Sequence, residues 1–377
     1  MLDRITLFRT TKRIVFGVGA VEKIGTEVQL LKGKKVLVVT DPGIIRAGLL
    51  EPLTNSIQAA GIPFALFDQV EPDPRIEVVE LCAEKARAEG SDCLIGYGGG
   101  SSLDIAKVAA VRLTNPGAID TLFGIDLIPN PGVPVLLVPT TAGTGSEVGR
   151  AGVLTNSETH KKKIIFHPKL MPAVTICDPA LTTGMPKFIT AGTGMDALAH
   201  CLEAFSSPFY HPMSQGIALE GMRLVFENLA KVYADPNDLD ARAHMMSAAA
   251  MGAVAFQKGL GAIHALSHPI GAVYNTHHGT TNAVVMPMVL DFNRKAVKDR
   301  LASAAAYCGI KGGYKGFYQR ILDLRQTLNI PENLTKLGVK DPDLDMLTQM
   351  ALEDPSCGGN PVKMTKRNTR ALFEACL

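Results

Sequence analysis

The first 180 residues repeat one pattern, in which a short apolar run ends in turn residues and is followed by a helical segment. In residues 76–89, for example, apolar residues lie on one helical face and charges on the other. The predicted strands are residues 34–40, 63–67, 92–98 and 133–140. Alternating strands and helices predict a parallel sheet covered on both sides, as in Rossmann-like nucleotide-binding domains.

The pattern changes near residue 180. From residue 188 onward, long helical patterns are separated by Pro and Gly, and no segment has the signature of a strand. A chain of 377 residues is long enough for two cores, and its 46% hydrophobic content is ordinary for a globular protein. We therefore expect an α/β domain over residues 1–180 and an all-helical domain over residues 181–377, with the functional site in the cleft between them.

Charge and cysteine content exclude several classes of protein. The 38 Lys and Arg residues nearly balance the 36 Asp and Glu residues, so nucleic acid is not an expected partner. No uncharged apolar run is long enough to span a membrane, and residues 1–16 lack the apolar core of a signal peptide. The seven cysteines are odd in number and scattered, which is typical of reduced thiols. We expect a cytoplasmic protein.

Two glycine-rich turns follow predicted strands, GYGGGSSLDIAK at residues 96–107 and PTTAGTGSEV at residues 139–148. Glycines let the backbone approach a ligand, and free amides at a helix start favour a pyrophosphate. Each turn alone has a simpler interpretation, as a tight turn or as a loop with one capping hydroxyl. Two such turns at strand ends favour a dinucleotide. The candidate residues are Gly98, Gly99, Gly100, Ser101, Thr140, Thr141, Thr144 and Ser146.

Asp41 follows the first of these predicted strands, in KKVLVVTDPG. A carboxylate at this position can accept hydrogen bonds from a ribose and would repel a 2′-phosphate, which favours NAD over NADP. An Asp before Pro-Gly is equally a good turn former. Both interpretations remain open at this point.

The segment TGMDALAHCLEAF predicts a buried helix that carries Asp196, His200 and Glu203 within an arc of about 60°. An isolated Asp and His pair is usually a buried hydrogen bond. A later segment of low charge, however, contains four of the nine histidines: His264, His268, His277 and His278. Carboxylate and imidazole ligands without cysteine suit a catalytic Zn²⁺ or Fe²⁺ with one open position. The spacing does not decide which of the four later histidines bind.

These segments, in this order and at these separations, resemble the iron-containing (group III) alcohol dehydrogenases. The resemblance covers nearly the whole chain and includes GYGGGSSLDIAK, TTAGTGSEV, the long Asp and His helix, and GAIHALSHPIGAVYNTHHGTTNAVVMP. It implies a dehydroquinate-synthase-like architecture, a homodimer, and the metal ligands Asp196, His200, His264 and His278. It also implies cofactor contacts from Asp41, the loop Gly98–Ser101 with Asp104, the pair Thr140 and Thr141, and Lys162.

The resemblance also places His268 near the nicotinamide as a possible proton relay, with His277 as a neighbour and His278 in the catalytic centre. Without it, Lys162 in HKKKIIF would be interpreted as part of a solvated basic run. Two positions depart from the family pattern: Asp73 stands where Asn is common, and Lys258 lies in a shortened segment before the second histidine cluster. Both changes could reshape the substrate end, so the resemblance does not identify the alcohol.

The expected activity is NAD-dependent, metal-assisted hydride transfer between a small uncharged alcohol and its aldehyde or ketone. One alternative is a lyase of the dehydroquinate-synthase type, which would need several basic residues around its substrate; the metal-bearing segments contain few, with Lys258 the exception. Another is a catalytically silent nucleotide-binding protein, in which a full set of metal ligands would have no purpose. The choice between iron and zinc stays open.

Overall fold

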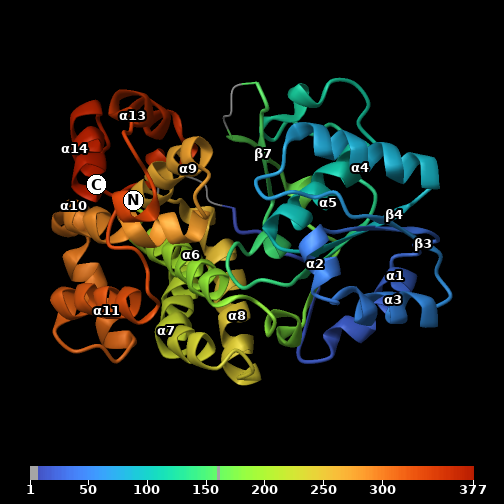
Figure 1. Cartoon of the computed structure of the whole chain (residues 1–377), viewed down its shortest axis with the longest axis horizontal. Helices are drawn as coiled ribbons and strands as arrows, with labels where there is room; N and C mark the ends of the chain where they lie inside the picture. Colours follow the sequence, from blue (N-terminus) through green and yellow to red (C-terminus); the bar gives the residue numbers. More distant parts are fainter. Residues whose placement is uncertain (1–6, 159–161) are drawn as a thin grey trace. The chain divides into compact units, whose positions relative to one another are not determined.

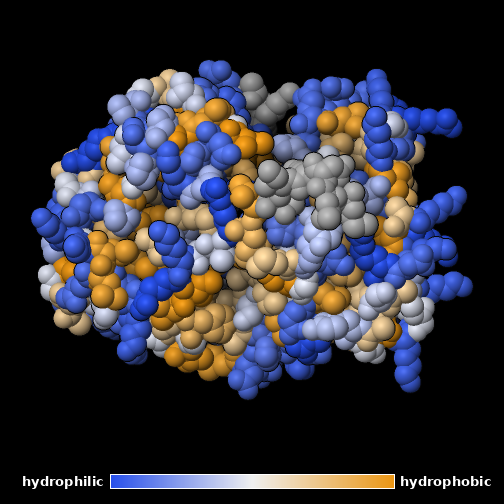
Figure 2. Space-filling view, turned by 180° about the vertical axis from the view of Figure 1, so that it is seen from behind, coloured by the Kyte–Doolittle hydropathy of each residue, from blue (hydrophilic) through white to orange (hydrophobic). Residues whose placement is uncertain are grey.

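The computed structural model describes residues 7–158 and 162–377 of the chain (Figure 1). Residues 1–6, part of the segment in which we expected no signal peptide, lie outside the described residues. None of the helices in the described ranges is long and apolar enough to cross a membrane. Hydrophilic residues are spread over the face shown in Figure 2, with patches of hydrophobic residues between them.

The chain forms two compact units. Arg9–Thr141 and Gly145–Gly184 make up the first, which we call the α/β unit. The second, the helical unit, consists of Met185–Leu377 together with the short segment Ala142–Thr144 and with Leu7 and Phe8. The centre of the second glycine-rich turn is therefore packed within the helical unit.

A six-stranded sheet forms the centre of the α/β unit, and all of its paired strands are parallel, as predicted. The strand order is β1-β9-β6-β4-β2-β3. The four predicted strands are confirmed, whereas β1 and β9 were not predicted. The strands are β1 (Ile14–Phe16), β2 (Val36–Val39), β3 (Phe64–Phe67), β4 (Cys93–Gly98), β6 (Val135–Pro139) and β9 (Val174–Cys177).

Helices cover both faces of this sheet, because successive residues of a strand point to opposite sides. In β2, Val36 and Val38 pack in the same core as α1 and α3, whereas Leu37 and Val39 pack in the core that contains α4 and α5. The expected two-sided arrangement is confirmed. The helices of this unit are α1 (Ile24–Leu30), α2 (Pro42–Arg46), α3 (Leu50–Ala59), α4 (Ile76–Glu89) and α5 (Gly100–Arg112), with 3₁₀ turns at Ala20–Lys23, Ile119–Leu122, Ser146–Val148, Pro168–Leu170 and Pro179–Thr182.

The α/β unit also contains a small three-stranded sheet that was not predicted. It consists of β5 (Gly124–Ile125), β8 (Lys162–Phe166) and β7 (Ala151–Thr155), and β7 and β8 are antiparallel. Residues 162–166 of HKKKIIF thus form a strand with partly exposed lysines; residues 160 and 161 lie outside the described part. Only Ile165 of β8 is buried, so the strand lacks the strong alternation by which strands are predicted.

The helical unit contains no strand from Met185 to Leu377, all of which the structure describes, and this confirms the prediction of an all-helical second half. Helix α6 is buried on all sides from Thr190 to Ser206 and packs against α7, α8 and α10 (Figure 1). The helices are α6 (Lys187–Ser206), α7 (Pro212–Ala234), α8 (Leu239–Ala255), α9 (Ala262–Tyr274), α10 (His278–Tyr307), α11 (Gly313–Thr327), α12 (Leu334–Leu337), α13 (Leu344–Glu353) and α14 (Lys366–Cys376), with 3₁₀ turns at Phe256–Lys258 and Pro355–Gly359.

Glycines bring α6 and α10 into backbone contact. A Cβ atom placed on Gly279, in the first turn of α10, would lie 2.1 Å from the carbonyl oxygen of Gly192 and 3.0 Å from the Cβ of Asp196. A Cβ on Gly192 would meet the ring of His277 at 2.5 Å. Only glycine leaves room for this approach, which sets the distance between the side chains that the two helices carry.

Candidate active site

Helix α6 carries Asp196, His200 and Glu203, and all three side chains are buried. The predicted polar arc brings Asp196 and His200 together, since Nε2 of His200 lies 3.8 Å from Oδ1 of Asp196. Glu203 has a different partner, because it points to α9 rather than to the other two side chains of the arc. Burial of three ionisable groups on one helix requires compensating contacts.

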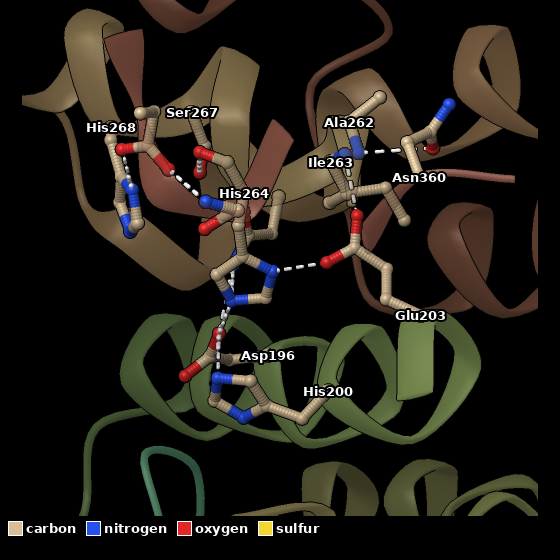
Figure 3. A network of polar contacts seen from close by, with 12 residues as sticks. Asp196, His200, Glu203, Ala262, Ile263, His264, Ser267, His268 and Asn360 are labelled. Atoms are coloured by element: carbon tan, nitrogen blue, oxygen red, sulfur yellow. Dashed lines mark hydrogen bonds and ion pairs between the residues drawn. The ribbon is translucent and has the colours of Figure 1, made fainter. Parts of the chain in front are cut away.

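Two more imidazoles lie near the same carboxylate oxygen, and Figure 3 shows one of them, that of His264, beside Asp196 and His200. Nε2 of His264, in the first turn of α9, lies 3.7 Å from Oδ1 of Asp196, and Nε2 of His278, the first residue of α10, lies 3.5 Å from it. Ligand atoms about 2.1 Å from a tetrahedral ion are separated by about 3.4 Å. The spacing of Asp196, His200 and His264 therefore fits a divalent ion, and these three form a group that could hold one. His278 shares the carboxylate oxygen of Asp196 but is not part of this group of three.

The electrostatics of the cluster favour a cation. Burial would raise the pKa of Asp196, but the imidazoles of His200, His278 and His264 outweigh it and hold that pKa below its ordinary value. Burial lowers the pKa of His200 to about 4, so this imidazole is neutral at pH 7 and can act as a ligand. The cluster thus contains an ionised carboxylate beside a neutral nitrogen donor.

Glu203 holds His264 from the side away from Asp196. Oε2 of Glu203 lies 2.6 Å from Nδ1 of His264, and Oε1 accepts a hydrogen bond of 2.6 Å from the backbone N–H of Ile263 (Figure 3). Burial would lower the pKa of His264, but Glu203 and Asp196 together raise it to about 10. Positive charge is therefore stabilised where Nε2 of His264 faces Asp196.

Asn282 completes the buried side of the cluster. Its Nδ2 donates to Oδ1 of Asp196 at 2.8 Å and lies 3.2 Å from Nε2 of His278. Its Oδ1 is buried and has no hydrogen-bond partner in the part of the chain that the structure describes. The amide therefore supports Asp196 from α10, four residues after His278.

His268 lies beside the cluster rather than in it. Its ring stacks on that of His278, with 5.2 Å between centroids, and its Nδ1 lies 2.7 Å from Oδ2 of Asp354. His277 precedes α10 as its N-cap, and Nδ1 accepts from the backbone N–H of Thr280 at 3.3 Å. Of the four histidines in the second segment, His264 and His278 thus face Asp196, His268 flanks His278, and His277 caps a helix.

The cluster is more accessible on one side than on the other. The side chains of Asp196 and His264 are 4% and 2% exposed, whereas those of His278 and His268 are 29% and 18% exposed. A substrate oxygen needs access to the ion from one side, and an ion with four protein ligands would have to expand to five-coordination to accept it. A substrate oxygen could approach where His278 and His268 are exposed.

The candidate cofactor residues of the α/β unit gather at the carboxyl ends of adjacent strands. Asp41 follows β2, the turn Gly98–Ser101 follows β4, and Thr140 and Thr141 follow β6. A Cβ on Gly99 would lie 3.6 Å from Thr141, and one on Gly98 would lie 3.1 Å from Oδ2 of Asp41. Strands β3 and β4 lie on opposite sides of β2. The order in which the chain adds strands to the sheet therefore reverses between β2 and β4, and open parallel sheets bind nucleotides at such a point.

Asp41 and Lys162 both have protein partners. Oδ1 of Asp41 caps α2 by accepting from the backbone N–H groups of Gly43 and Ile44, and Oδ2 accepts from Ser102 at 3.3 Å. The turn-forming role of Asp41 is therefore present, and its second oxygen faces the glycine-rich turn. Nζ of Lys162, at the start of β8, lies 2.5 Å from Oδ1 of Asp73.

A buried lysine ties the second glycine-rich turn to α5. Nζ of Lys107 donates to the hydroxyl of Ser146 at 2.7 Å and to its carbonyl oxygen at 3.1 Å, and it pairs with Asp104 at 2.9 Å. Ser146 in turn donates to Asp104, whose other oxygen accepts from the N–H of Val153 at 2.9 Å. Asp104 and Ser146 are therefore hydrogen-bonded to each other. Thr144, from the same glycine-rich turn as Ser146, belongs to the helical unit.

The sequence analysis assigned no role to the residues that contact the candidate site residues from outside, which are Glu203, Asn282, Asp354 and Lys107. Glu203 was marked on the polar arc of its helix, and this was the only available signal. Asn282 follows His278 by four residues, the spacing at which two side chains share a helical face. Asp354 lies 86 residues from His268, so no local pattern connects them.

Known proteins match both units. The family model described as "Iron-containing alcohol dehydrogenase" matches residues 11–179, and "Fe-containing alcohol dehydrogenase family, C-terminal" matches residues 190–377. The 4-hydroxybutyrate dehydrogenase of Cupriavidus necator is 37% identical, covering 94% of this chain and 96% of the relative. The 1,3-propanediol dehydrogenase of Klebsiella pneumoniae is also 37% identical, with 95% of each covered.

An NAD-dependent methanol dehydrogenase of Bacillus methanolicus is 35% identical, covering 96% of this chain and 97% of the relative. Among solved structures, a 1,3-propanediol oxidoreductase has a TM-score of 0.96 at 36% identity, covering 99% of this chain and 100% of that one. A sulfoacetaldehyde reductase of Bifidobacterium kashiwanohense in complex with NAD⁺ has a TM-score of 0.91 at 27% identity, with 99% of each covered. The similarity thus extends over the whole chain.

Proposed function

Because this chain belongs to the iron-containing alcohol dehydrogenase family, we propose that Asp196, His200, His264 and His278 hold its iron. The protein is an NAD-dependent oxidoreductase that interconverts an alcohol and its aldehyde, with NAD and Fe²⁺ as cofactors and a dehydroquinate-synthase-like architecture. A lyase is not favoured, because the relatives are dehydrogenases. The ligand assignment rests on one observation: three Nε2 atoms lie 3.5, 3.7 and 3.8 Å from one carboxylate oxygen.

Oxidation of an alcohol removes one hydride and one proton, and the chain must manage the proton. Bound iron supplies Lewis-acid polarisation of the substrate oxygen, and NAD accepts the hydride. We assign His268 as the residue that takes the hydroxyl proton at Nε2, since its Nδ1 is held by Asp354. His278 contributes the exposed edge of the cluster, at which the substrate enters. In the reverse direction His268 returns the proton.

We further propose that the α/β unit binds NAD, through Asp41 and the turns at Gly98, Gly99, Gly100, Ser101, Thr140 and Thr141. The proximity of these residues at the strand ends supports this assignment. Asp104 and Ser146 contact each other, and Asp104 also pairs with Lys107. These contacts favour a role for both residues in fixing the conformation of the second glycine-rich turn. Thr144 and Lys162 are retained as candidate contacts. The first 180 residues then serve the cofactor, and residues 181–377 serve the metal and the alcohol.

A small uncharged alcohol is our proposed substrate. Lys258, the cation closest in sequence to the second histidine cluster, is buried and donates to the carbonyl oxygen of Phe205 at 3.1 Å. It therefore does not offer a charge to a carboxylate substrate. A panel that includes 1,3-propanediol, methanol and 4-hydroxybutyrate separates the alternatives, because a preference for 4-hydroxybutyrate would contradict the proposal.

Replacement of His264 by alanine tests the metal assignment. The variant should lose bound iron and alcohol-dependent NADH formation, while its dissociation constant for NAD stays within about twofold of the wild-type value. Metal analysis, an NADH absorbance assay and a titration with NAD measure these three quantities. Retention of full iron content and turnover would show that the ligand assignment is wrong.

We also propose a cytoplasmic homodimer. The described residues contain seven free cysteines, which supports a reducing compartment. Strand β1 is an edge of the sheet and exposes Ile14 and Phe16 at 44% and 46%, and such an edge favours pairing with a second copy. Light scattering should give a mass of two chains for the wild type and of one chain for Phe16→Lys.

A further inference from the structure

The carboxylate of Glu203 joins two elements that the metal site needs. Glu203 projects from α6, where Asp196 and His200 also lie, and it is 5% exposed. Its two oxygens make two different hydrogen bonds to α9, one with the backbone N–H of Ile263 and one with Nδ1 of His264, both at 2.6 Å. Glu203 thus connects α6 to α9 at His264, which is itself a candidate metal ligand (Figure 3).

We propose that Glu203 is a positioning residue for the metal, an inference that rests on the iron site proposed above. Because Glu203 accepts at Nδ1, the hydrogen on that nitrogen is held in place. The proton that a metal ion would displace is then the one on Nε2, which lies 3.7 Å from Oδ1 of Asp196. A histidine ligand commonly donates its second N–H to a carboxylate, which fixes the tautomer and the ring orientation. Glu203 sets both for His264.

The two contacts require a carboxylate rather than an amide. Two N–H groups point at Glu203, and a carboxylate offers an acceptor oxygen to each. Glutamine has the same length but only one oxygen, so its NH₂ group must face either the N–H of Ile263 or that of His264. If the NH₂ group faces Ile263, a buried backbone N–H loses its acceptor. If it faces His264, it donates to Nδ1, and the remaining hydrogen of the ring moves to Nε2, the atom proposed to bind the metal.

Asn360 supplies a matched control, because it caps the same helix end without touching an imidazole. Its Oδ1 accepts from the backbone N–H of Ala262 at 3.1 Å and from Asn293 at 2.8 Å. Loss of this cap weakens the start of α9 as loss of Glu203 would, but it leaves the contact between Glu203 and His264 in place. Effects of helix stability can therefore be separated from effects of ring orientation.

The test measures metal affinity on full-length protein from which the metal has been removed by chelation. Zn²⁺ and Co²⁺ are titrated in competition with a coloured chelator, and melting temperatures of the metal-free proteins are recorded. Glu203→Gln should bind about 10- to 100-fold more weakly than the wild type. Asn360→Ser should lower the melting temperature while changing the affinity less than about threefold.

Equal affinity of Glu203→Gln and the wild type would overturn the inference, as would an equal loss in both variants. If Glu203→Gln does not fold, Glu203→Asp is measured instead. Aspartate keeps the charge but is one methylene too short for both contacts, so its affinity must also fall, and an unchanged value overturns the inference. Failure of the wild type itself to bind metal would instead contradict the proposed iron site.

Discussion

Nδ1 of His268 lies 2.7 Å from Oδ2 of Asp354, and the other oxygen of this carboxylate accepts from the backbone N–H of Ser356 at 2.8 Å. The second bond fixes Asp354 in the turn, so the carboxylate in turn fixes the ring of His268. Burial would raise the pKa of Asp354, but its electrostatic interaction and hydrogen bond with His268 outweigh burial and lower that pKa. Asp354 is therefore an ionised acceptor at neutral pH.

Replacement of Asp354 by asparagine should lower kcat for alcohol oxidation by about tenfold or more, since general acid–base groups contribute on the order of 10²- to 10⁴-fold. Iron content should stay at the wild-type level, because Asp354 does not contact a proposed ligand. Steady-state kinetics and metal analysis test both statements. His268→Ala should lose at least as much activity, and an unchanged kcat in both variants would remove His268 from the mechanism.

Replacement of Lys107 by methionine should raise the KM for NAD by about tenfold without changing iron content. Lys107 is 1% exposed, and its loss removes two hydrogen bonds to Ser146 and the ion pair with Asp104, at a cost of about 1–3 kcal/mol in unfolding free energy. Lys85→Met is the control, because Lys85 forms an exposed pair with Glu89, and exposed ion pairs contribute little to stability. Equal KM values for NAD in the two variants would contradict a role for Lys107 in holding the turn.

Glu147 should make the protein less stable as the pH rises from about 5 to 8. Burial raises the pKa of its carboxyl to about 7, although its backbone hydrogen bond and Lys107 oppose the shift. A carboxyl with a raised folded-state pKa contributes stability below its unfolded pKa near 4.3, and this contribution is lost as the pH passes through 7.

Glu147→Gln removes this titration and should therefore raise the melting temperature at pH 8 relative to the wild type, with a much smaller gain at pH 5. The full effect on unfolding free energy is on the order of 3 kcal/mol. Thermal melts of both proteins across this pH range measure the difference. A constant difference at all pH values would mean that Glu147 is ionised in the folded protein throughout.

Gly279→Ala should weaken metal binding and destabilise the fold, because its Cβ would lie 2.1 Å from the carbonyl oxygen of Gly192 and push α10 from α6. His278 would move away from Asp196 with the helix. Gly216→Ala in α7 is the control, since its Cβ meets no atom within 4 Å, and it should stabilise by about 0.4–1 kcal/mol. Competition titration and melting curves test the pair, and wild-type affinity in Gly279→Ala would show that the close approach of α10 to α6 is not required for metal binding.

The sequence was sufficient to predict the parallel sheet and the helical second half, because their patterns are local. Strand β1 escaped prediction because only three residues pair and its burial does not follow a strong alternation. Strand β8 is only half-buried, and because its first residues are lysines of HKKKIIF, it lacks the apolar pattern from which strands are predicted. Two contacts depend on how the helices pack: Asp354 with His268, and Glu203 with His264. Their partners are 86 and 61 residues apart, and no periodic pattern in a single sequence connects residues at such separations.

The convergence of Asp196, His200, His264 and His278 within one unit has a thermodynamic consequence. The residues proposed to hold the ion all lie in the helical unit, and those proposed to bind the dinucleotide, apart from Thr144, lie in the α/β unit. The affinity for each ligand can therefore be determined in the absence of the other. If saturation with NAD changes the affinity for iron, the ratio of the two constants gives the coupling free energy between the units, and linkage requires the reciprocal effect of iron on NAD to be equal.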